Sequence, residues 1–342
     1  MKAKPFTICE ISGNHNGKLS NLLFLIKKAK QIGASAVKIQ TFKPEKMALT
    51  SNKEFIIKSK NSEWNNKNLY NIYRKTSVPY GWHKNIFNFA KKINIQIFSS
   101  PFSKEDVVFL ENFKPPFYKI ASLENTNLPL LKSVAKTRRK IFLSTGTATK
   151  SELKKSINIL KKFGSKKIVL LKCITDYPAD PGDYNLNTLL DMKKTFKCEV
   201  GISDHTVGPT VGIASIFFGA KYFEKHLCLN NRKKADIDSF YSTTVDDFEK
   251  YIQYLNEASA CSGKVNYGNT KSELISKNRR RKIFYTQDLK SGSILKENNI
   301  YGLRALSGIG IENFEDFINK KLIKNVNKNT LLKRKDIFDE KR

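Results

Sequence analysis

The chain repeats one local pattern eight times: a short apolar run followed by a segment with helical periodicity. Apolar runs without polar alternation are typical of strands that are buried on both faces, as in a parallel sheet covered by helices. Eight such units within residues 1–262 predict a (β/α)8 TIM barrel. In this fold the functional site lies at the carboxyl ends of the strands, so residues at strand exits are the first candidates for chemistry.

One long segment interrupts this regular pattern near the N-terminus. Residues 43–78 form a polar excursion between the second strand and the next helix, and insertions of this length are uncommon and usually functional. The expected strands cover residues 6–12, 36–41, 95–100, 117–122, 140–145, 168–173, 198–200 and a run ending at 226. The expected helices cover residues 20–31, 80–92, 104–112, 128–136, 150–163, 186–196, 207–219 and 245–260.

The pattern changes after residue 262. Residues 263–281 are polar and end in a basic run, which predicts a linker. Residues 282–342 contain short alternating apolar pieces and predict a small, mostly-β C-terminal domain. A module below ~70 residues gains stability by docking on another surface.

The formal net charge of +31 favours an anionic partner. Only 10 of the 62 basic residues are arginine, and the lysines are spread over the whole chain. A nucleic-acid-binding surface would more often cluster arginine with aromatic residues, so we expect no nucleic acid. A small anionic substrate is the preferred interpretation.

Cysteine usage and hydropathy bear on the compartment. The five cysteines include no CxxC pair, which argues against a disulfide framework or a zinc knuckle. No run of 18 apolar residues occurs, and the N-terminus leads directly into a strand pattern without a signal-peptide core. We therefore expect a cytoplasmic protein with no membrane partner.

Two of the four histidines follow predicted strands. His205 ends the stretch 201–205, and His226 ends the eighth strand, so neighbouring parallel strands would bring the two imidazoles together. Imidazole is a common metal ligand, and Glu10 at the first strand exit would add an oxygen ligand. Two nitrogen ligands and one oxygen ligand suit Mn²⁺ or a similar divalent ion. The alternative for each histidine is a hydrogen-bonded structural role.

Other strand exits carry groups that could bind an anion or transfer a proton. Polar strand ends that meet water explain the serines, but they explain poorly the charged residues Glu10, Lys38, Lys119 and Glu224 within apolar runs. Glu124 is a candidate acid or base, with a helix-capping carboxylate as the alternative. Tyr177, in a turn after the sixth strand, could contact substrate. The residues that could together surround a phosphate are Lys38, Lys119, Ser122, Ser144 and Ser203.

The chain resembles the sialic acid synthase family, the phosphoenolpyruvate-dependent nonulosonate synthases. The resemblance spans the whole length, and the C-terminal module resembles the antifreeze-like (SAF) domain of these enzymes. Within the family, the insertion resembles that of the pseudaminic acid synthases at residues 52–58, Trp64, 69–73 and 79–83. The motifs that carry the family resemblance are residues 9–17, 37–41, 99–103, 118–122, 143–146, 201–206 and 224–226.

This resemblance implies an enzyme that condenses phosphoenolpyruvate with an acetamido sugar, aided by a divalent metal. The metal would be Mn²⁺, with Mg²⁺ or Co²⁺ as alternatives, held by His205 and His226 with Glu10 close by. Glu124 would handle protons near the new bond. The resemblance assigns phosphoenolpyruvate to Lys38, Gln40, Ser100, Lys119, Ser122, Ser144 and Ser203, and the sugar to Tyr177, Asp238 and Arg304.

The resemblance also implies a homodimer in which the small domain reaches the partner's barrel. Arg304 would then touch the sugar, although Ala305 follows it where the family usually has proline. Asp236 competes with Asp238 as the acidic sugar contact because the spacing after the eighth strand is irregular. The alternatives are an N-acetylneuraminate or legionaminate synthase with the same chemistry on another hexose, and a non-catalytic carbohydrate-binding protein.

Overall fold

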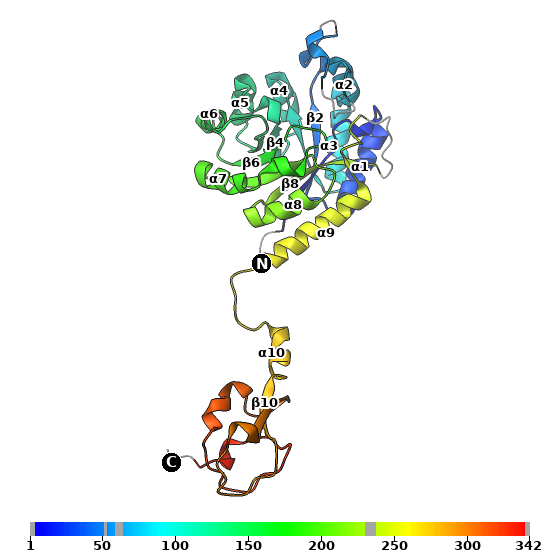
Figure 1. Ribbon diagram of the computed structural model, residues 1–342. Helices are drawn as coiled ribbons and strands as arrows, with labels where there is room; N and C mark the ends of the chain where they lie inside the picture. The colour runs from blue at the N-terminus through cyan, green and yellow to red at the C-terminus, as the bar shows by residue number, and fades with distance from the viewer. Residues whose placement is uncertain (1–3, 51–52, 59–63, 230–236, 339–342) are drawn as a thin grey trace. The chain divides into compact units, whose positions relative to one another are not determined.

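The computed structural model describes residues 4–50, 53–58, 64–229 and 237–338. The chain divides into two compact units, Met1–Gly263 and Lys264–Arg342. In the first unit eight parallel strands pair in chain order, and β1 also pairs with β8, which closes the sheet. Helices surround the strands (Figure 1). The predicted (β/α)8 barrel is confirmed.

The barrel elements alternate along the chain as predicted, and a two-residue strand, β9, follows the eighth barrel strand and pairs with it. The strands are β1 (Phe6–Glu10), β2 (Ala36–Thr41), β3 (Gln96–Pro101), β4 (Phe117–Ile120), β5 (Lys140–Ser144), β6 (Ile168–Cys173), β7 (Glu199–Asp204), β8 (Tyr222–Cys228) and β9 (Thr243–Thr244). The helices are α1 (Leu19–Gln31), α2 (Leu69–Thr76), α3 (His83–Lys92), α4 (Lys104–Glu111), α5 (Leu128–Lys136), α6 (Lys150–Lys162), α7 (Asn187–Phe196), α8 (Thr210–Ser215) and α9 (Val245–Cys261).

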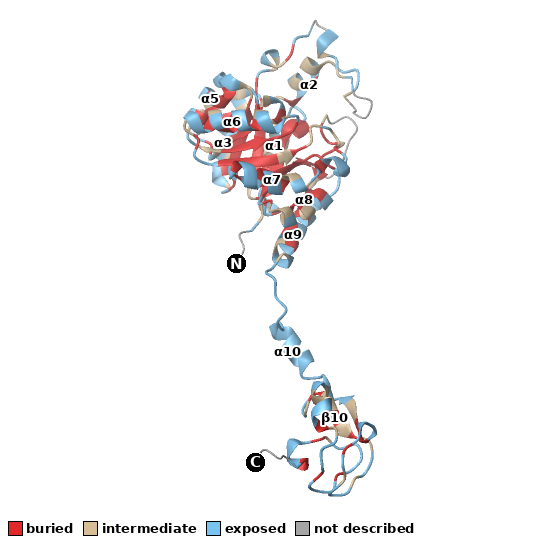
Figure 2. Cartoon of the chain, turned by 60° about the vertical axis from the view of Figure 1, so that its left-hand side comes forward, coloured by how far each residue is buried: buried red, intermediate tan, exposed pale blue. Residues whose placement is uncertain are grey.

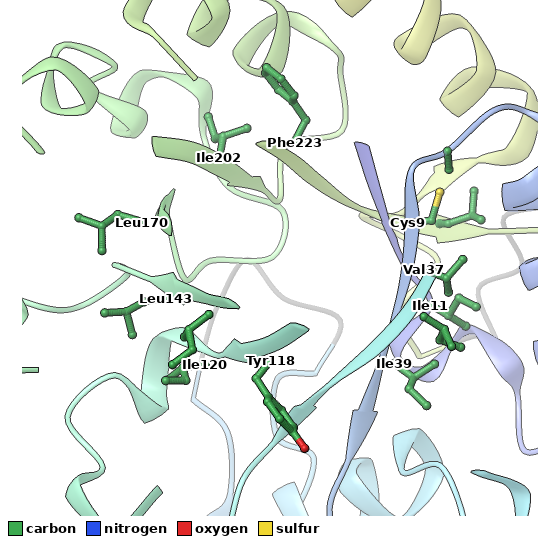
Figure 3. Close-up of a cluster of buried hydrophobic side chains, with 14 of the residues drawn as sticks. Cys9, Ile11, Val37, Ile39, Tyr118, Ile120, Leu143, Leu170, Ile202 and Phe223 are labelled. Carbon is green, nitrogen blue, oxygen red and sulfur yellow. The ribbon is translucent and has the colours of Figure 1, made fainter. Parts of the chain in front are cut away.

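Strand residues separate into two apolar clusters because successive side chains point to opposite faces of a sheet. One set, which includes Ile8, Phe98 and Phe142, fills the inside of the barrel. The other set contacts the helices, and Figure 3 shows members of it from several strands. Burial on both faces explains why the strands read as continuous apolar runs. The labelled residues of the outer set are Cys9, Ile11, Val37, Ile39, Tyr118, Ile120, Leu143, Leu170, Ile202 and Phe223.

The helices bury one face against the strands and expose the other, as the mixed colours of their ribbons show (Figure 2). Helix α6 buries Leu153, Ile157 and Leu160, which have helical spacing. Its N-terminus carries a capping box formed by Thr149 and Glu152, which satisfies free backbone donors. Within the described residues, no helix combines the length and the apolar character needed to cross a bilayer.

Two segments differ from the prediction. Strand β7 runs to Asp204 and therefore includes Gly201–Asp204, which the sequence pattern placed after the strand. The glycine makes this possible, since a Cβ on Gly201 would lie 2.3 Å from the carbonyl oxygen of Tyr222 on the adjacent strand. Within the polar excursion, the structure contains helix α2, whose N-terminus is capped by the side chain of Asn68.

The second unit has its own small core. Strands β10 (Arg281–Tyr285) and β11 (Ile300–Arg304) form an antiparallel pair, and isolated bridges at Leu289, Ile294 and Leu322 tie the remaining loops together. The polar segment predicted as a linker contains helix α10 (Lys271–Lys277). The buried residues of this core are Ile283, Tyr285, Leu295, Ile300, Phe317, Leu322, Val326, Leu332 and Ile337.

Gly201→Ala should destabilise the barrel, because the added methyl group meets the backbone of β8 rather than a movable side chain. We expect a loss of about 1–3 kcal/mol in the free energy of unfolding, measured by urea unfolding with far-ultraviolet circular dichroism. Gly81→Ala is the matched control, since nothing lies within 4 Å of a Cβ at that position. Equal stability of both variants would show that strands β7 and β8 do not approach this closely.

Candidate active site

Strand register brings the candidate residues to one end of the barrel. Glu10 of β1 lies opposite Lys38 of β2 on one side and His226 of β8 on the other. Ser203 of β7 lies opposite Glu224 of β8. Because alternate residues on a strand share a face, Glu224 and His226 point to the same side of β8. Charged, hydroxyl and imidazole groups from these four strands therefore converge at the strand exits.

Glu224 is the centre of a buried charge cluster. Its Oε1 accepts hydrogen bonds from Lys119 Nζ at 2.5 Å, Ser203 Oγ at 2.9 Å and Lys38 Nζ at 3.0 Å. Lys38 Nζ also lies 2.7 Å from Glu10 Oε2. None of the four charged residues is more than 4% exposed. Two cations and two anions balance each other, which is how buried charges are tolerated.

The lysines keep the Glu224 carboxylate ionised. Burial alone would raise the pKa of Glu224, but the ammonium groups of Lys119 and Lys38 outweigh it and hold the pKa well below its usual range. Glu224 therefore remains an internal counter-ion for two lysines that can also bind an anionic ligand. Lysine pairs with serine hydroxyls are a suitable set of donors for a phosphate.

His205 and His226 lie side by side, with ring centroids 5.4 Å apart. His205 Nδ1 donates to the carbonyl oxygen of Ile174 at 2.7 Å, which leaves Nε2 as the ring nitrogen that could bind a metal. His226 Nδ1 is buried and has no hydrogen-bond partner within the described residues. Burial, followed by the nearby His205 and Lys38, lowers the pKa of His226 well below its usual value, so this imidazole is neutral. Two adjacent imidazole rings are a suitable pair of nitrogen ligands for a divalent metal.

Glu10 does not complete a three-residue metal site. Its Oε1 accepts from the Ser12 backbone N–H at 2.7 Å, and its Oε2 faces Lys38. Among residues 4–50, 53–58, 64–229 and 237–338, no group of three or more His, Cys, Asp or Glu side chains has the arrangement of a metal centre. Glu10 was expected to be the oxygen ligand, but the lysine competes for its carboxylate.

The predicted serines are buried or nearly buried at the same strand exits. Ser100 Oγ is buried and has no hydrogen-bond partner in the described part of the chain. Ser144 is 1% exposed, and Ser122 lies against Gly146, where a Cβ would come within 2.6 Å of Ser122 Oγ. The side chain of Gln40 is bonded to the turn after β1, where its Nε2 donates to the Ser12 hydroxyl at 3.1 Å.

Glu124 lies in the turn after β4, two residues beyond Ser122. It ends a short 3₁₀ turn and is half-buried, and its Oε2 accepts from Asn127 Nδ2 at 2.6 Å. Burial is the largest influence on Glu124 and raises its pKa. A carboxyl group with a raised pKa can give and take a proton near neutral pH more readily than an ordinary one.

The three residues expected to bind a sugar have different locations. The ring of Tyr177 lies 4.3 Å from that of His205. Asp238 is buried and accepts from the Gly13 backbone N–H at 2.7 Å. Its competitor, Asp236, lies outside the described residues. Arg304 is exposed on β11 of the second unit.

Several residues that contact the candidates were not among the predicted site residues. Glu224 is the most important, and its spacing of two residues from His226 was the available signal, because it predicts a shared face. Tyr241 is 2% exposed, and its ring lies 4.8 Å from that of His226. On the outer face of the same strands, Lys225 Nζ contacts Asp204 Oδ2 at 2.9 Å and fixes the strand exit beside His205.

The fold and the site together define a (β/α)8 barrel that holds two buried lysines and two glutamates next to a pair of imidazoles at its strand exits. The model of the NeuB family matches residues 25–267, and the chain belongs to that family. The predicted relationship to the sialic acid synthases is thereby confirmed.

Named relatives agree with this assignment. The chain is 36% identical to the pseudaminic acid synthase of Campylobacter jejuni, over 97% of this chain and 96% of that protein. It is 34% identical to the pseudaminic acid synthase of Helicobacter pylori, over 98% and 99%. Among solved structures, the N-acetylneuraminic acid (sialic acid) synthetase of Leptospira borgpetersenii matches with a TM-score of 0.70 and 26% identity, covering 80% of this chain and 90% of that one.

Glu224→Gln should destabilise the protein at neutral pH, because it removes the carboxylate that Lys119 contacts and leaves Lys38 with Glu10 alone. We expect a loss of about 3–5 kcal/mol in the free energy of unfolding at pH 7, measured by urea unfolding. Glu257→Gln, at an exposed position, is the control and should change little.

The difference in the free energy of unfolding between wild type and Glu224→Gln should become smaller as the pH falls below 4.5, the ordinary pKa of a glutamate. A carboxylate with a depressed pKa in the folded state contributes stability above its unfolded pKa and loses it as the pH falls toward the folded value. A difference that stays constant down to pH 3 would contradict the role of Glu224 as counter-ion.

Proposed function

We propose that this chain condenses phosphoenolpyruvate with a 2,4-diacetamido-2,4,6-trideoxy hexose of the L-altrose type. The reaction joins C3 of phosphoenolpyruvate to the aldehyde carbon of the open-chain sugar. Water adds at C2, and phosphate leaves by C–O cleavage, so the products are a nonulosonic acid of the pseudaminic type and phosphate. The observation that carries the proposal is the buried Lys38–Glu224–Lys119 cluster beside the two imidazoles.

The lysines and serines would bind the phosphoenolpyruvate. Lys38 and Lys119 supply charge, and the Ser203 hydroxyl supplies a directed donor. The buried Ser100 hydroxyl, which has no partner in the described residues, is an available donor for the same anion. Preorganised donors in a water-poor site stabilise charge more strongly than donors in water. Ser122, Ser144 and Gln40 are proposed as further contacts.

His205 and His226 would hold a divalent metal, with Mn²⁺ expected and Mg²⁺ or Co²⁺ as alternatives. When bound, the metal supplies Lewis-acid polarisation of the aldehyde oxygen. Glu10 would hold Lys38 in place and contact the reacting groups. Glu124, whose pKa is raised by burial, would exchange a proton with the sugar oxygen near the new bond.

Tyr177 and Asp238 would contact the sugar, and Arg304 would contact it from a partner subunit. We propose a homodimer in which the second unit, as an antifreeze-like (SAF) domain, reaches the barrel of the other copy. An exposed arginine on a small domain with its own core suits such a contact. The five free cysteines suit a reducing compartment, and we propose the cytoplasm.

Mass spectrometry of products tests the proposed function. The protein is mixed with phosphoenolpyruvate, Mn²⁺ and a panel of acetamido hexoses. We expect a nine-carbon acid from the trideoxy sugar and phosphate release in equal amount. Product from N-acetylmannosamine instead would identify an N-acetylneuraminate synthase, and a legionaminate precursor would identify a legionaminate synthase. Sugar binding without any product would support the non-catalytic alternative.

His226→Ala should abolish turnover and weaken Mn²⁺ binding, because it removes one of the two imidazoles that would hold the metal. Isothermal titration calorimetry measures the metal binding independently of activity. His83→Gln is the control, since His83 is buried and bonded to Thr41 and should not affect the metal. Normal Mn²⁺ affinity in His226→Ala would remove His226 from the metal site.

A further inference from the structure

Trp64, in the long insertion, is attached to the loop that follows β8. Its indole Nε1 donates to the carbonyl oxygen of Ile237 at 2.9 Å. Its ring lies 5.8 Å from those of Phe240 and Tyr241, nearly perpendicular to both. The hydrogen bond joins two residues that are 173 positions apart in the chain. The insertion and the loop therefore meet at one indole ring.

The same indole extends an aromatic wall that reaches the imidazole pair. Trp64 lies 5.3 Å from Tyr177, which lies 4.9 Å from Tyr241. Tyr177 contacts His205 at 4.3 Å, and Tyr241 contacts His226 at 4.8 Å, as measured between ring centroids. We name Trp64, Tyr177, Phe240 and Tyr241 the aromatic wall. It stands beside the imidazoles and is distinct from the lysine cluster.

The loop that carries Phe240 and Tyr241 is also fixed by the turn that follows the first barrel strand. Asp238 accepts from the Gly13 backbone N–H at 2.7 Å, and Asn14 Nδ2 donates to Ser242 Oγ at 2.9 Å. Trp64 and Phe240 are half-buried, whereas Tyr241 is 2% exposed. Hydrogen bonds to Gly13 and Asn14 therefore fix the loop that carries Phe240 and Tyr241. Trp64 is the member of the wall that comes from the insertion.

We propose that Trp64 is a specificity-determining residue: it closes the sugar end of the site with an apolar face that selects a hexose bearing a methyl group at C6. The proposal rests on the proposed function. An aromatic face packs favourably against a methyl group and against C–H groups, whereas a hydroxyl placed there loses water without gaining a partner. An apolar surface of this kind discriminates against an added hydroxyl by roughly a hundredfold at most.

Steady-state kinetics of Trp64→Phe and Trp64→Ala test this role with two sugars, the 6-deoxy diacetamido hexose and the same hexose with a hydroxyl at C6. We expect wild type to prefer the 6-deoxy sugar by roughly tenfold to a hundredfold in kcat/KM. Trp64→Ala should raise KM for the 6-deoxy sugar about tenfold, leave KM for phosphoenolpyruvate within about twofold, and lose most of the preference. Trp64→Phe should retain much of the preference for the 6-deoxy sugar, because it keeps an aromatic face.

A binding measurement that keeps Trp64 in place does not depend on whether the Trp64 variants fold. The chain has two tryptophans, and the other, Trp82, lies against His15. Trp82→Phe therefore leaves Trp64 as the sole indole. We expect its fluorescence to change on addition of the 6-deoxy sugar and to stay unchanged on addition of phosphoenolpyruvate alone.

Two results would overturn the assignment while the proposed function stands. One is an equal loss of kcat/KM for both sugars in Trp64→Ala with KM unchanged, which indicates a general structural role. The other is Trp64 fluorescence that does not respond to saturating 6-deoxy sugar in an active Trp82→Phe enzyme. Wild type that forms no product from any hexose in the panel would instead overturn the proposed function, and the role of Trp64 with it.

Discussion

The contact of Glu224 with two lysines is the interaction on which the site depends. Without this carboxylate, Lys119 would lose its carboxylate partner inside the barrel, and Lys38 would keep only its contact with Glu10. With the Glu224 carboxylate present, the charges of the cluster at the strand exits nearly balance, and the lysines can still bind an anion. The hydrophobic interior of the barrel, around Phe98 and Phe142, lies next to this cluster and limits access of water from that side.

The barrel could be predicted from the sequence because its signal is local and repeated. Each apolar run is a strand buried on both faces, and eight repeats leave few alternatives. The strand exits followed from the same pattern, which is why Lys38, Lys119 and both histidines of the pair were found. The end of β7 was misplaced, because the role of Gly201 depends on the closeness of Tyr222, a neighbour in space rather than in sequence.

The pairing of charges could not be predicted in the same way. Glu10 is a plausible metal ligand by residue type, but its carboxylate faces Lys38 once β1 and β2 are in register. The insertion was recognised as unusual, yet the contact of Trp64 with Tyr177 and Tyr241 depends on two loops far apart in the chain. Residue types show which side chains could form ion pairs or ring contacts. The tertiary structure decides which of these contacts form.

The anchor of His205 is a main-chain carbonyl, that of Ile174. Every residue type has this oxygen, so substitutions at position 174 leave the tautomer of the imidazole unchanged as long as the backbone keeps its path. Evolution can therefore vary the side chain at this position without touching the chemistry beside it. Comparison of related sequences would overlook the anchor for the same reason, since nothing in the identity of the residue records it.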